Sequence, residues 1–259
     1  MNIIHTIILS IVEGITEFLP VSSTFHLIFT SKLLGIPDSS FVQLFEVFIQ
    51  GGAILSVVII YFQTILKDLE LSKKIVVSFF PTAIVGLVLY KMIKKVFFQS
   101  PYLMIGVFIL FGIIFLITEY LVKHKKINLQ KSTKTLTYKE AIIIGLIQSL
   151  AVIPGVSRAG AVIIAMMFLG YKRDESARYS FILAIPTILA ASFYDLYKMR
   201  DVAFHNMNNI RVLSLGFVGA FVCSYFVVKW LLSYLQRNSL TVFGWYRVAL
   251  GIIILIIGK

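Results

Sequence analysis

The sequence predicts an all-α integral membrane protein with six transmembrane helices and two re-entrant helix pairs in two inverted-topology repeats. Three observations lead to this fold class. The 259 residues are 59% hydrophobic and only 14% charged, with a mean hydropathy of +0.93, whereas soluble domains are about 45–50% apolar. Six apolar segments are long enough to span a bilayer, and two further apolar regions are broken near their middle. A water-soluble globular enzyme is therefore excluded.

The six predicted spans each have about 20 residues, the length that crosses roughly 30 Å of hydrocarbon. They cover residues 41–62, 74–94, 101–122, 177–198, 212–235 and 242–258. The apolar regions 3–34 and 140–170 differ, because Pro20 and Pro154 divide each into halves that are too short to span. Proline ends the preceding helix and leaves unpaired backbone groups, which must face protein or a wet cavity. We therefore predict that each region is a re-entrant helix pair.

The two broken regions also resemble each other. A shift of 134 positions carries Pro20 onto Pro154 and Ser23 onto Ser157. We therefore expect two repeats, each a re-entrant pair followed by three spans, with chance similarity of apolar segments as the alternative. Because three spans separate the breaks, the second repeat enters from the opposite side and the breaks meet near the bilayer midplane. The repeats cover 1–122 and 140–259, and 123–139 is a basic cytoplasmic linker.

The charge of the chain indicates its orientation. There are 24 Lys and Arg against 12 Asp and Glu, a formal charge of +12, and most basic residues lie in short gaps between apolar runs. This placement is typical of a membrane protein and argues against nucleic-acid binding. The linker side holds 14 basic residues and the side of the termini holds 8, so we expect a cytoplasmic linker, both termini outside and a first break that opens outward. The eight are Lys32, Lys91, Lys94, Lys95, Lys198, Arg200, Arg211 and Lys259.

Glu13 and Glu17 are the first candidates for function, because ionisable side chains inside apolar segments are costly. They are four residues apart and therefore lie on one face of the predicted helix. Two carboxylates this close repel each other unless a cation or an arginine lies between them. The pair predicts a divalent cation, Mg²⁺ or Ca²⁺. The alternative is a structural pair that caps exposed amides at the break.

Ser23 and His26 are three residues apart on the helix that follows Pro20. This spacing lets the imidazole approach the hydroxyl and take its proton, the usual activation of a weak nucleophile. Alternatively, Ser22 or Ser23 is a helix N-cap and His26 is a buried structural histidine.

Arg158 stands at the second break, directly after Ser157 and close to Gly155. A helix N-terminus supplies free amides, glycine permits close approach of the backbone, and arginine offers a planar fork for phosphate oxygens. Together these features predict an anion site. The alternative is an arginine that only neutralises Glu13 or Glu17.

Other polar residues in the spans give weaker signals. Gln50 follows Glu46 by four residues and is a further candidate to face the cavity. Tyr246 and Arg247 lie in the last span without a role that the pattern indicates. Cys223, the single cysteine, lies in an apolar run and excludes an intrachain disulfide.

The residues at the two breaks occur in segments that resemble one family, the undecaprenyl-diphosphatases or bacitracin-resistance proteins. Residues 13–24, EGITEFLPVSST, followed by His26, are similar to the first signature of that family, and residues 154–158, PGVSR, are similar to the second. Further similarity covers 45–50, 180–186 and 195–198. The resemblance implies hydrolysis of undecaprenyl diphosphate to undecaprenyl phosphate and phosphate at the outer face of the bacterial inner membrane. This reaction recycles the lipid carrier of cell-wall synthesis and confers bacitracin resistance.

The resemblance also implies roles for single residues. Glu17, Ser23, His26 and Arg158 would be catalytic or phosphate-binding, and Glu13 would support the metal with Glu17. Ser23 is the expected nucleophile, with His26 as a rival. The residues expected to contact the substrate are Ser22, Thr24, Gly155, Ser157 and Gln50.

Three residues depart from the family pattern. Phe25 stands where the family usually has glycine, Ala159 replaces a serine and Val162 replaces a threonine. The last two changes each remove a hydroxyl that could bind phosphate, worth about 0.5–1.5 kcal/mol. Phe25 adds bulk beside the expected pocket.

Two other functions compete with the phosphatase. One is a carrier that moves prenyl phosphate across the membrane with the same fold, and the other is a catalytically silent protein that keeps the fold. The carboxylate pair with the Ser/His cluster favours hydrolysis, because simple lipid transport does not need it. The sequence indicates no oligomeric state.

Overall fold

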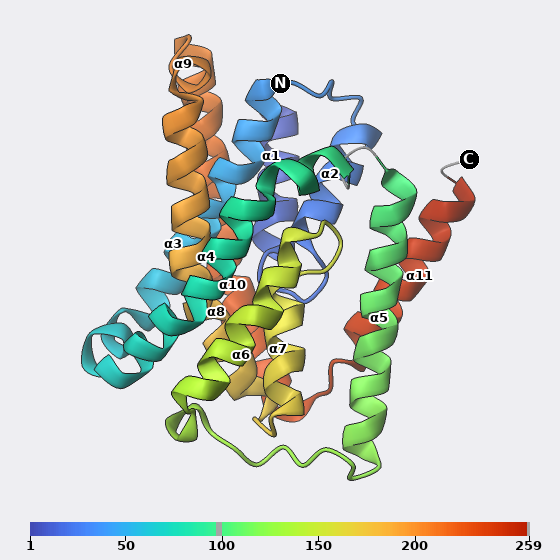
Figure 1. Cartoon of the computed structure of the whole chain (residues 1–259). Helices are drawn as coiled ribbons and strands as arrows, with labels where there is room; N and C mark the ends of the chain where they lie inside the picture. Colours follow the sequence, from blue (N-terminus) through green and yellow to red (C-terminus); the bar gives the residue numbers. More distant parts are fainter. Residues whose placement is uncertain (97–99, 258–259) are drawn as a thin grey trace.

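The computed structural model describes the backbone of residues 1–96 and 100–257 and the side chains of residues 1–88 and 100–257. This part of the chain is all-helical (Figure 1). Its α-helices are α1 (Ile3–Thr16), α2 (Ser23–Leu33), α3 (Ser40–Lys67), α4 (Leu69–Val96), α5 (Pro101–Lys123), α6 (Tyr138–Gln148), α7 (Arg158–Phe168), α8 (Arg173–Lys198), α9 (Arg200–Ala203), α10 (Met207–Arg237) and α11 (Thr241–Ile257). Short 3₁₀-helices cover Thr133–Thr135 and Ser149–Val152.

Five of the described helices, α3, α4, α5, α8 and α10, are long and apolar enough to cross a membrane. They coincide with the first five predicted spans and confirm an all-helical, multi-pass membrane protein. The sixth predicted span, 242–258, is the shorter α11, whose 17 described residues extend for about 26 Å. The side chains of Lys91, Lys94 and Lys95, and the whole of Lys259, lie outside the described residues.

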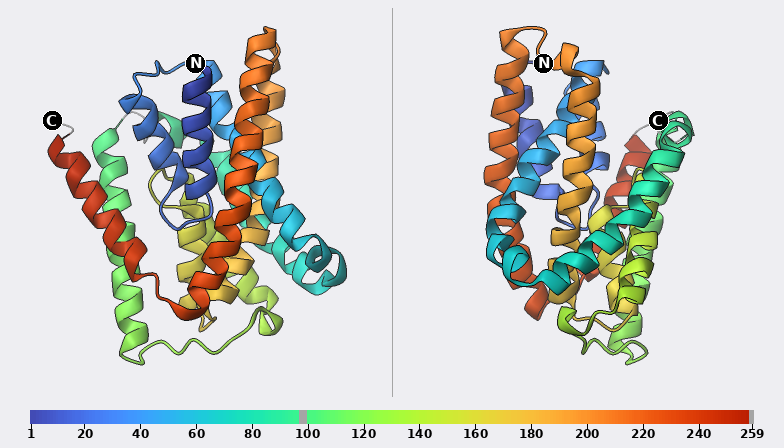
Figure 2. Two further views of the ribbon diagram at one scale, coloured as in Figure 1. Left: turned by 180° about the vertical axis from the view of Figure 1, so that it is seen from behind. Right: turned by 60° about the vertical axis from the view of Figure 1, so that its left-hand side comes forward.

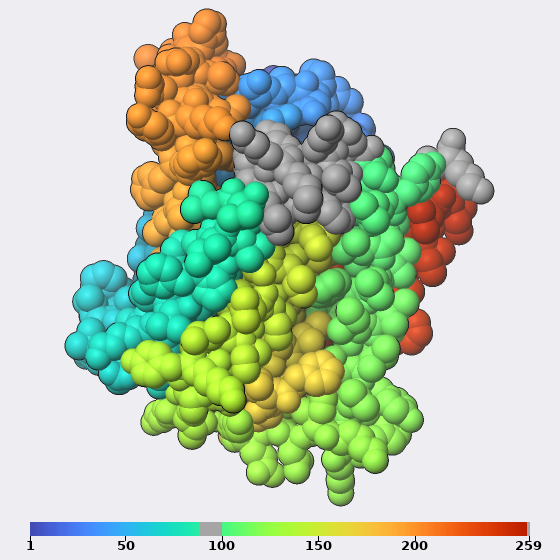
Figure 3. All heavy atoms as spheres, in the orientation of Figure 1, coloured from blue at the N-terminus to red at the C-terminus, as the bar shows by residue number. Residues whose placement is uncertain are grey.

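The surface of α4 carries large exposed apolar side chains, among them Ile84, Leu87 and Val88. Figure 3 shows the face on which α6 lies between α4 and α5, with the linker across one end. Exposed apolar surface of this extent is typical of a membrane-contacting protein.

Each broken region forms two short helices that contact each other, α1 with α2 and α6 with α7. Figures 1 and 2 show that the two pairs run in from opposite ends of the molecule and turn back near its middle. The prediction of two helices interrupted at Pro20 and Pro154 is therefore confirmed.

The two breaks end in the same backbone conformation. Ser22 has φ 68°, Ser157 has φ 70°, and α2 and α7 begin at the next residue. Positive φ is uncommon for residues other than glycine. By this criterion the counterpart of Ser157 is Ser22. The sequence alignment had paired Ser157 with Ser23, one residue further on, because the two turns differ in length. Of these two serines, only Ser157 caps its helix with a side-chain hydrogen bond: its Oγ accepts from the amide of Gly160 at 3.2 Å.

The short helices are held by close packing against long ones. A Cβ on Gly14 of α1 would lie 2.4 Å from the Cβ of Cys223 in α10, and a Cβ on Gly145 of α6 would lie 2.1 Å from the carbonyl oxygen of Ser78 in α4. The hydroxyls of Ser224 and Ser78 donate across the same contacts to backbone carbonyls of α1 and α6. Larger side chains at Gly14 or Gly145 would push these helices apart.

The last helix, α11, packs along α5 (Figure 2, left). Gly112 and Gly244 face each other there, because a Cβ on either one would lie within 3.1 Å of the carbonyl oxygen of the other. The linker lies at the end of the molecule away from the N-terminus, where the amides of Gln130 and Lys131 donate to the carbonyl of Gly170.

Candidate active site

Glu17 connects the two breaks. Its Oε1 accepts a hydrogen bond from Nη2 of Arg158 at 2.7 Å, across 141 positions of sequence, and its Oε2 accepts from the hydroxyl of Ser23. The side chains of Glu17 and Arg158 are only 6% and 12% exposed. Three residues that stand at or next to helix ends, Glu17 after α1, Ser23 in α2 and Arg158 in α7, therefore form one buried cluster.

Glu13 lies next to this cluster in α1. It is fully buried, and no N–H or hydroxyl donor of the described residues reaches its carboxylate oxygens, although the Glu17 carboxyl lies close enough to share a proton with it. Glu13 interacts electrostatically with Glu17, Glu46 and Arg158. Because buried polar groups are normally hydrogen-bonded, these two oxygens require either a proton shared with Glu17 or a further partner.

Arg158 also keeps a free donor. Its Nη1 is buried and has no hydrogen-bond partner in the described part of the chain, while Nη2 is held by Glu17. The pairing with Glu17 that the sequence left as an alternative is thus present, and it leaves one side of the guanidinium for another acceptor.

His26 binds neither Ser23 nor Glu17. Its Nδ1 lies 2.8 Å from the carbonyl oxygen of Ser22, and its Nε2 lies 2.7 Å from the hydroxyl of Tyr246 in α11. A carbonyl only accepts, so Nδ1 carries the proton and Nε2 accepts from the tyrosine. The sequence predicted that His26 takes the proton of Ser23. In the structure the serine hydroxyl instead donates to the carboxylate of Glu17.

Arg247 is a site residue to which the sequence assigned no role. It is fully buried, and its guanidinium donates to the carbonyls of Phe108 in α5 (3.0 Å), Pro20 at the first break (3.2 Å) and Gly155 at the second. One side chain of α11 is thus hydrogen-bonded to both breaks and to α5. The only signal in the sequence was an arginine inside an apolar span, which needs several acceptors.

The structure gives fewer contacts for the other residues that were predicted to bind the substrate. Gly155 has φ 98°, and a Cβ there would lie 2.7 Å from the carbonyl oxygen of Met104, so its backbone packs directly on α5. Thr24 and Gln50 are half-buried, and no hydrogen bond of their side chains is present among the described residues. Glu46 accepts from the hydroxyl of Ser31 at 3.1 Å.

Phe25 packs against α5. Its ring is fully buried and stacks on that of Phe108, with centroids 3.8 Å apart and an angle of 6° between the rings. Together with Met104 and Ile105 it forms a small hydrophobic cluster of its own. Its bulk therefore stabilises the contact between α2 and α5. Ala159 and Val162 are buried in α7.

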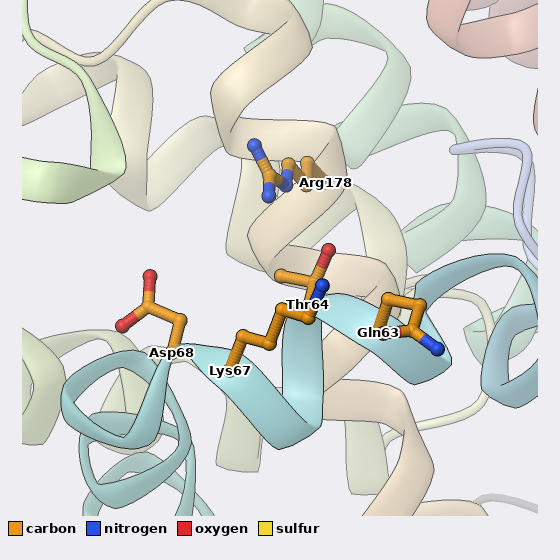
Figure 4. A pocket seen from close by; sticks show the side chains of 5 residues that line it. All are labelled: Gln63, Thr64, Lys67, Asp68 and Arg178. Carbon is orange, nitrogen blue, oxygen red and sulfur yellow. The ribbon is translucent and has the colours of Figure 1, made fainter.

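Two hollows on the molecule lie away from these residues. One, of about 490 Å³, is lined by Gln63, Thr64, Lys67, Asp68 and Arg178 at the end of α3 (Figure 4). The other, of about 530 Å³, lies along α5 next to the start of α11. Neither is lined by a predicted site residue. The contacts of Glu17 with Ser23 and Arg158 make the buried cluster between the two breaks the candidate active site.

The fold and the cluster define a class: a multi-pass helical membrane protein with a carboxylate, a serine and an arginine buried between two helix breaks. A family model described as bacitracin resistance protein BacA matches residues 6–253, and the chain belongs to this family. This confirms the resemblance expected from residues 13–24 and 154–158.

Relatives match along nearly the full length. An undecaprenyl-diphosphatase of Sulfurihydrogenibium sp. is 44% identical over 253 residues, 98% of each chain. One of Aquifex aeolicus is 42% identical over 249 residues, 96% of each chain, and one of Campylobacter fetus is 44% identical over 259 residues, 99% of each chain.

Proposed function

We propose that this protein is an undecaprenyl-diphosphatase, which hydrolyses undecaprenyl diphosphate to undecaprenyl phosphate and phosphate, recycles the lipid carrier of the cell wall and thereby confers bacitracin resistance. One observation carries the proposal: Glu17 accepts from Ser23 and Arg158 at the same time. This arrangement places a base, a nucleophile and a phosphate-binding cation together. The names of the full-length relatives support the same reaction.

In this mechanism Ser23 is the nucleophile. Its Oγ attacks the terminal phosphorus while its proton passes to Glu17, to which it is already hydrogen-bonded. The bond between that phosphorus and the bridging oxygen breaks, and its electron pair leaves with undecaprenyl phosphate. Water then attacks that phosphorus and its protons leave with the released phosphate, while the serine oxygen departs from phosphorus and takes its proton back from Glu17.

Arg158 binds the phosphate that is transferred. Its free Nη1 is the donor available for a phosphate oxygen, and Nη2 keeps the arginine in place through Glu17. A buried guanidinium stabilises the charge that spreads over phosphate oxygens during the transfer. Further contacts to the diphosphate are expected around the starts of α2 and α7, where free backbone amides bind phosphate. The residues are Ser22, Thr24, Gly155 and Ser157, together with Gln50 of α3.

Glu13 and Glu17 would hold a divalent cation, Mg²⁺ or Ca²⁺, together with the diphosphate. The two oxygens of Glu13, which no N–H or hydroxyl donor of the described residues reaches, support this, because a buried carboxylate needs a counter-charge. No three Asp, Glu, His or Cys residues of the described chain converge, so the diphosphate would have to supply the remaining ligands, as substrate phosphates commonly do for Mg²⁺. When bound, the cation would neutralise charge on the diphosphate.

The site would open to the outer face of the bacterial inner membrane. The central linker and the termini lie at opposite ends of the molecule, and the more basic linker belongs in the cytoplasm. The pairs α1–α2 and α6–α7 would be re-entrant in inverted repeats. Their matched contacts support this, because α1 packs on α10 of the second half as α6 packs on α4 of the first.

Metal removal tests the activity and the cation together. We expect purified protein in detergent to release phosphate from undecaprenyl diphosphate, to lose this release with excess EDTA, and to regain it with Mg²⁺ or Ca²⁺. Activity that persists after exhaustive chelation would reject the cation. Translocation of prenyl phosphate in vesicles, without any release of phosphate, would instead favour the carrier function.

The nucleophile is tested by trapping the phosphorylated enzyme. We expect a brief reaction with ³²P-labelled substrate to leave an acid-stable, alkali-labile phosphoenzyme, as phosphoserine does, and Ser23→Ala to lose it. An acid-labile, alkali-stable adduct lost in His26→Ala would identify histidine as the nucleophile.

A further inference from the structure

The last helix brings Tyr246 to the candidate site. Its hydroxyl lies 2.7 Å from Nε2 of His26, and the two rings are nearly parallel, at 7°, with centroids 5.7 Å apart. The other ring nitrogen, Nδ1, is bonded to the carbonyl of Ser22. Both nitrogens of His26 are therefore occupied, one by its own helix start and the other by a residue 220 positions away.

Tyr246 is held in place by the next residue. Arg247 donates to carbonyls at both breaks and in α5, and its guanidinium lies 4.5 Å from the centre of the Phe108 ring. Because this anchor is buried and adjacent in sequence, α11 has little freedom to carry the tyrosine away from His26. Tyr246 itself is 42% exposed, so its substitution by phenylalanine leaves the packing largely intact.

We propose that Tyr246 is a positioning residue for the reaction, acting through His26; the proposal rests on the proposed phosphatase function. Its hydroxyl bonds the imidazole to α11, and the imidazole in turn bonds the carbonyl of Ser22, the residue before Ser23. The start of α2 is thereby fixed where the serine hydroxyl donates to Glu17, the base that the cluster provides. Without the tyrosine hydroxyl, Nε2 has no donor, the imidazole is held only by the Ser22 carbonyl, and Ser23 is less well fixed against Glu17.

Tyr246→Phe tests this role in the full chain. We expect kcat to fall by about 3- to 10-fold, the effect of one hydrogen bond, with KM within twofold of the unchanged protein. In a His26→Asn background the same substitution should have no further effect, because residues that act through one another are not additive. Tyr102→Phe is the matched control, since Tyr102 is an exposed tyrosine at the start of α5.

A nitrogen spectrum of ¹⁵N-histidine-labelled protein gives a readout independent of activity. The chain has 4 histidines, and the His26 signals are those lost in His26→Asn. We expect the unprotonated Nε2 signal to move in Tyr246→Phe toward that of a nitrogen without a donor, while the Nδ1 signal stays. An unmoved Nε2 signal, a rise in KM with constant kcat, or an equal loss in the His26→Asn background would each overturn the proposal. A wild-type protein that releases no phosphate while Nε2 still moves would reject the phosphatase function and leave the contact intact.

Discussion

Glu17→Gln should lower phosphate release by about 10³-fold, within the range that a general base contributes. The glutamine amide keeps the size of the side chain but takes no proton from Ser23. It also leaves Arg158 buried without its ion-pair partner, a change that destabilises the fold. Single-turnover release of phosphate, measured on protein that still elutes as a folded species, separates the loss of catalysis from the loss of fold.

The matched control for this experiment is Glu70→Gln. Glu70 is an exposed carboxylate at the start of α4 that pairs with Lys73, and its change should leave the rate within about twofold, because surface ion pairs contribute little. If Glu17→Gln retained the rate of this control at equal amounts of folded protein, Glu17 would not be the base.

Much of the fold was accessible from the sequence, because its causes are local. Apolar segments of about 20 residues predict spans, and five of them are long helices in the structure. Pro20 and Pro154 predict breaks because each removes a donor and is followed by small polar residues. Proline alone does not end a helix here, since Pro81 and Pro186 lie inside α4 and α8. The length of α11 and the extra helix α9 depend on packing and on helix ends, which hydropathy does not resolve.

The partners in the site were harder to predict, because they depend on how the breaks turn. Helical spacing suggested His26 as the partner of Ser23, three residues away on one helix. The structure instead pairs Ser23 with Glu17, six residues earlier and beyond a proline turn. Spacing rules apply within a helix, and a turn that reverses the chain brings together residues that no periodicity relates.

Arg247 shows the same limit over a longer range. Its acceptors belong to Pro20, Phe108 and Gly155, and all three are backbone carbonyls. A carbonyl carries no signature in the sequence, so a search for a charged partner finds none. The carbonyls of Pro20 and Gly155 are available because the chain turns there, and the turn is known only from the structure.

Arg247→Met should destabilise the protein by at least about 2 kcal/mol. Methionine partly fills the space of the arginine stem, but the carbonyls of Pro20 and Gly155 lose their donor, and each unsatisfied group costs about 1–3 kcal/mol. The Phe108 carbonyl lies inside α5 and keeps its helical hydrogen bond. Arg247→Lys should lie between methionine and arginine, because an ammonium is a point charge that cannot reproduce the planar fork to three acceptors. The midpoint of thermal unfolding in detergent ranks the three proteins.

Arg237→Met provides the comparison, because Arg237 is an exposed arginine at the end of α10. If both methionine variants unfolded at the same temperature, the bonds of Arg247 would contribute nothing to holding the two breaks together. If Arg247→Met unfolded early and also lost phosphate release before unfolding, the same side chain would be needed for the geometry that brings Glu17 to Arg158. The ion pair joins two segments that are separate in sequence, and Arg247 is a side chain bonded to the backbone of both.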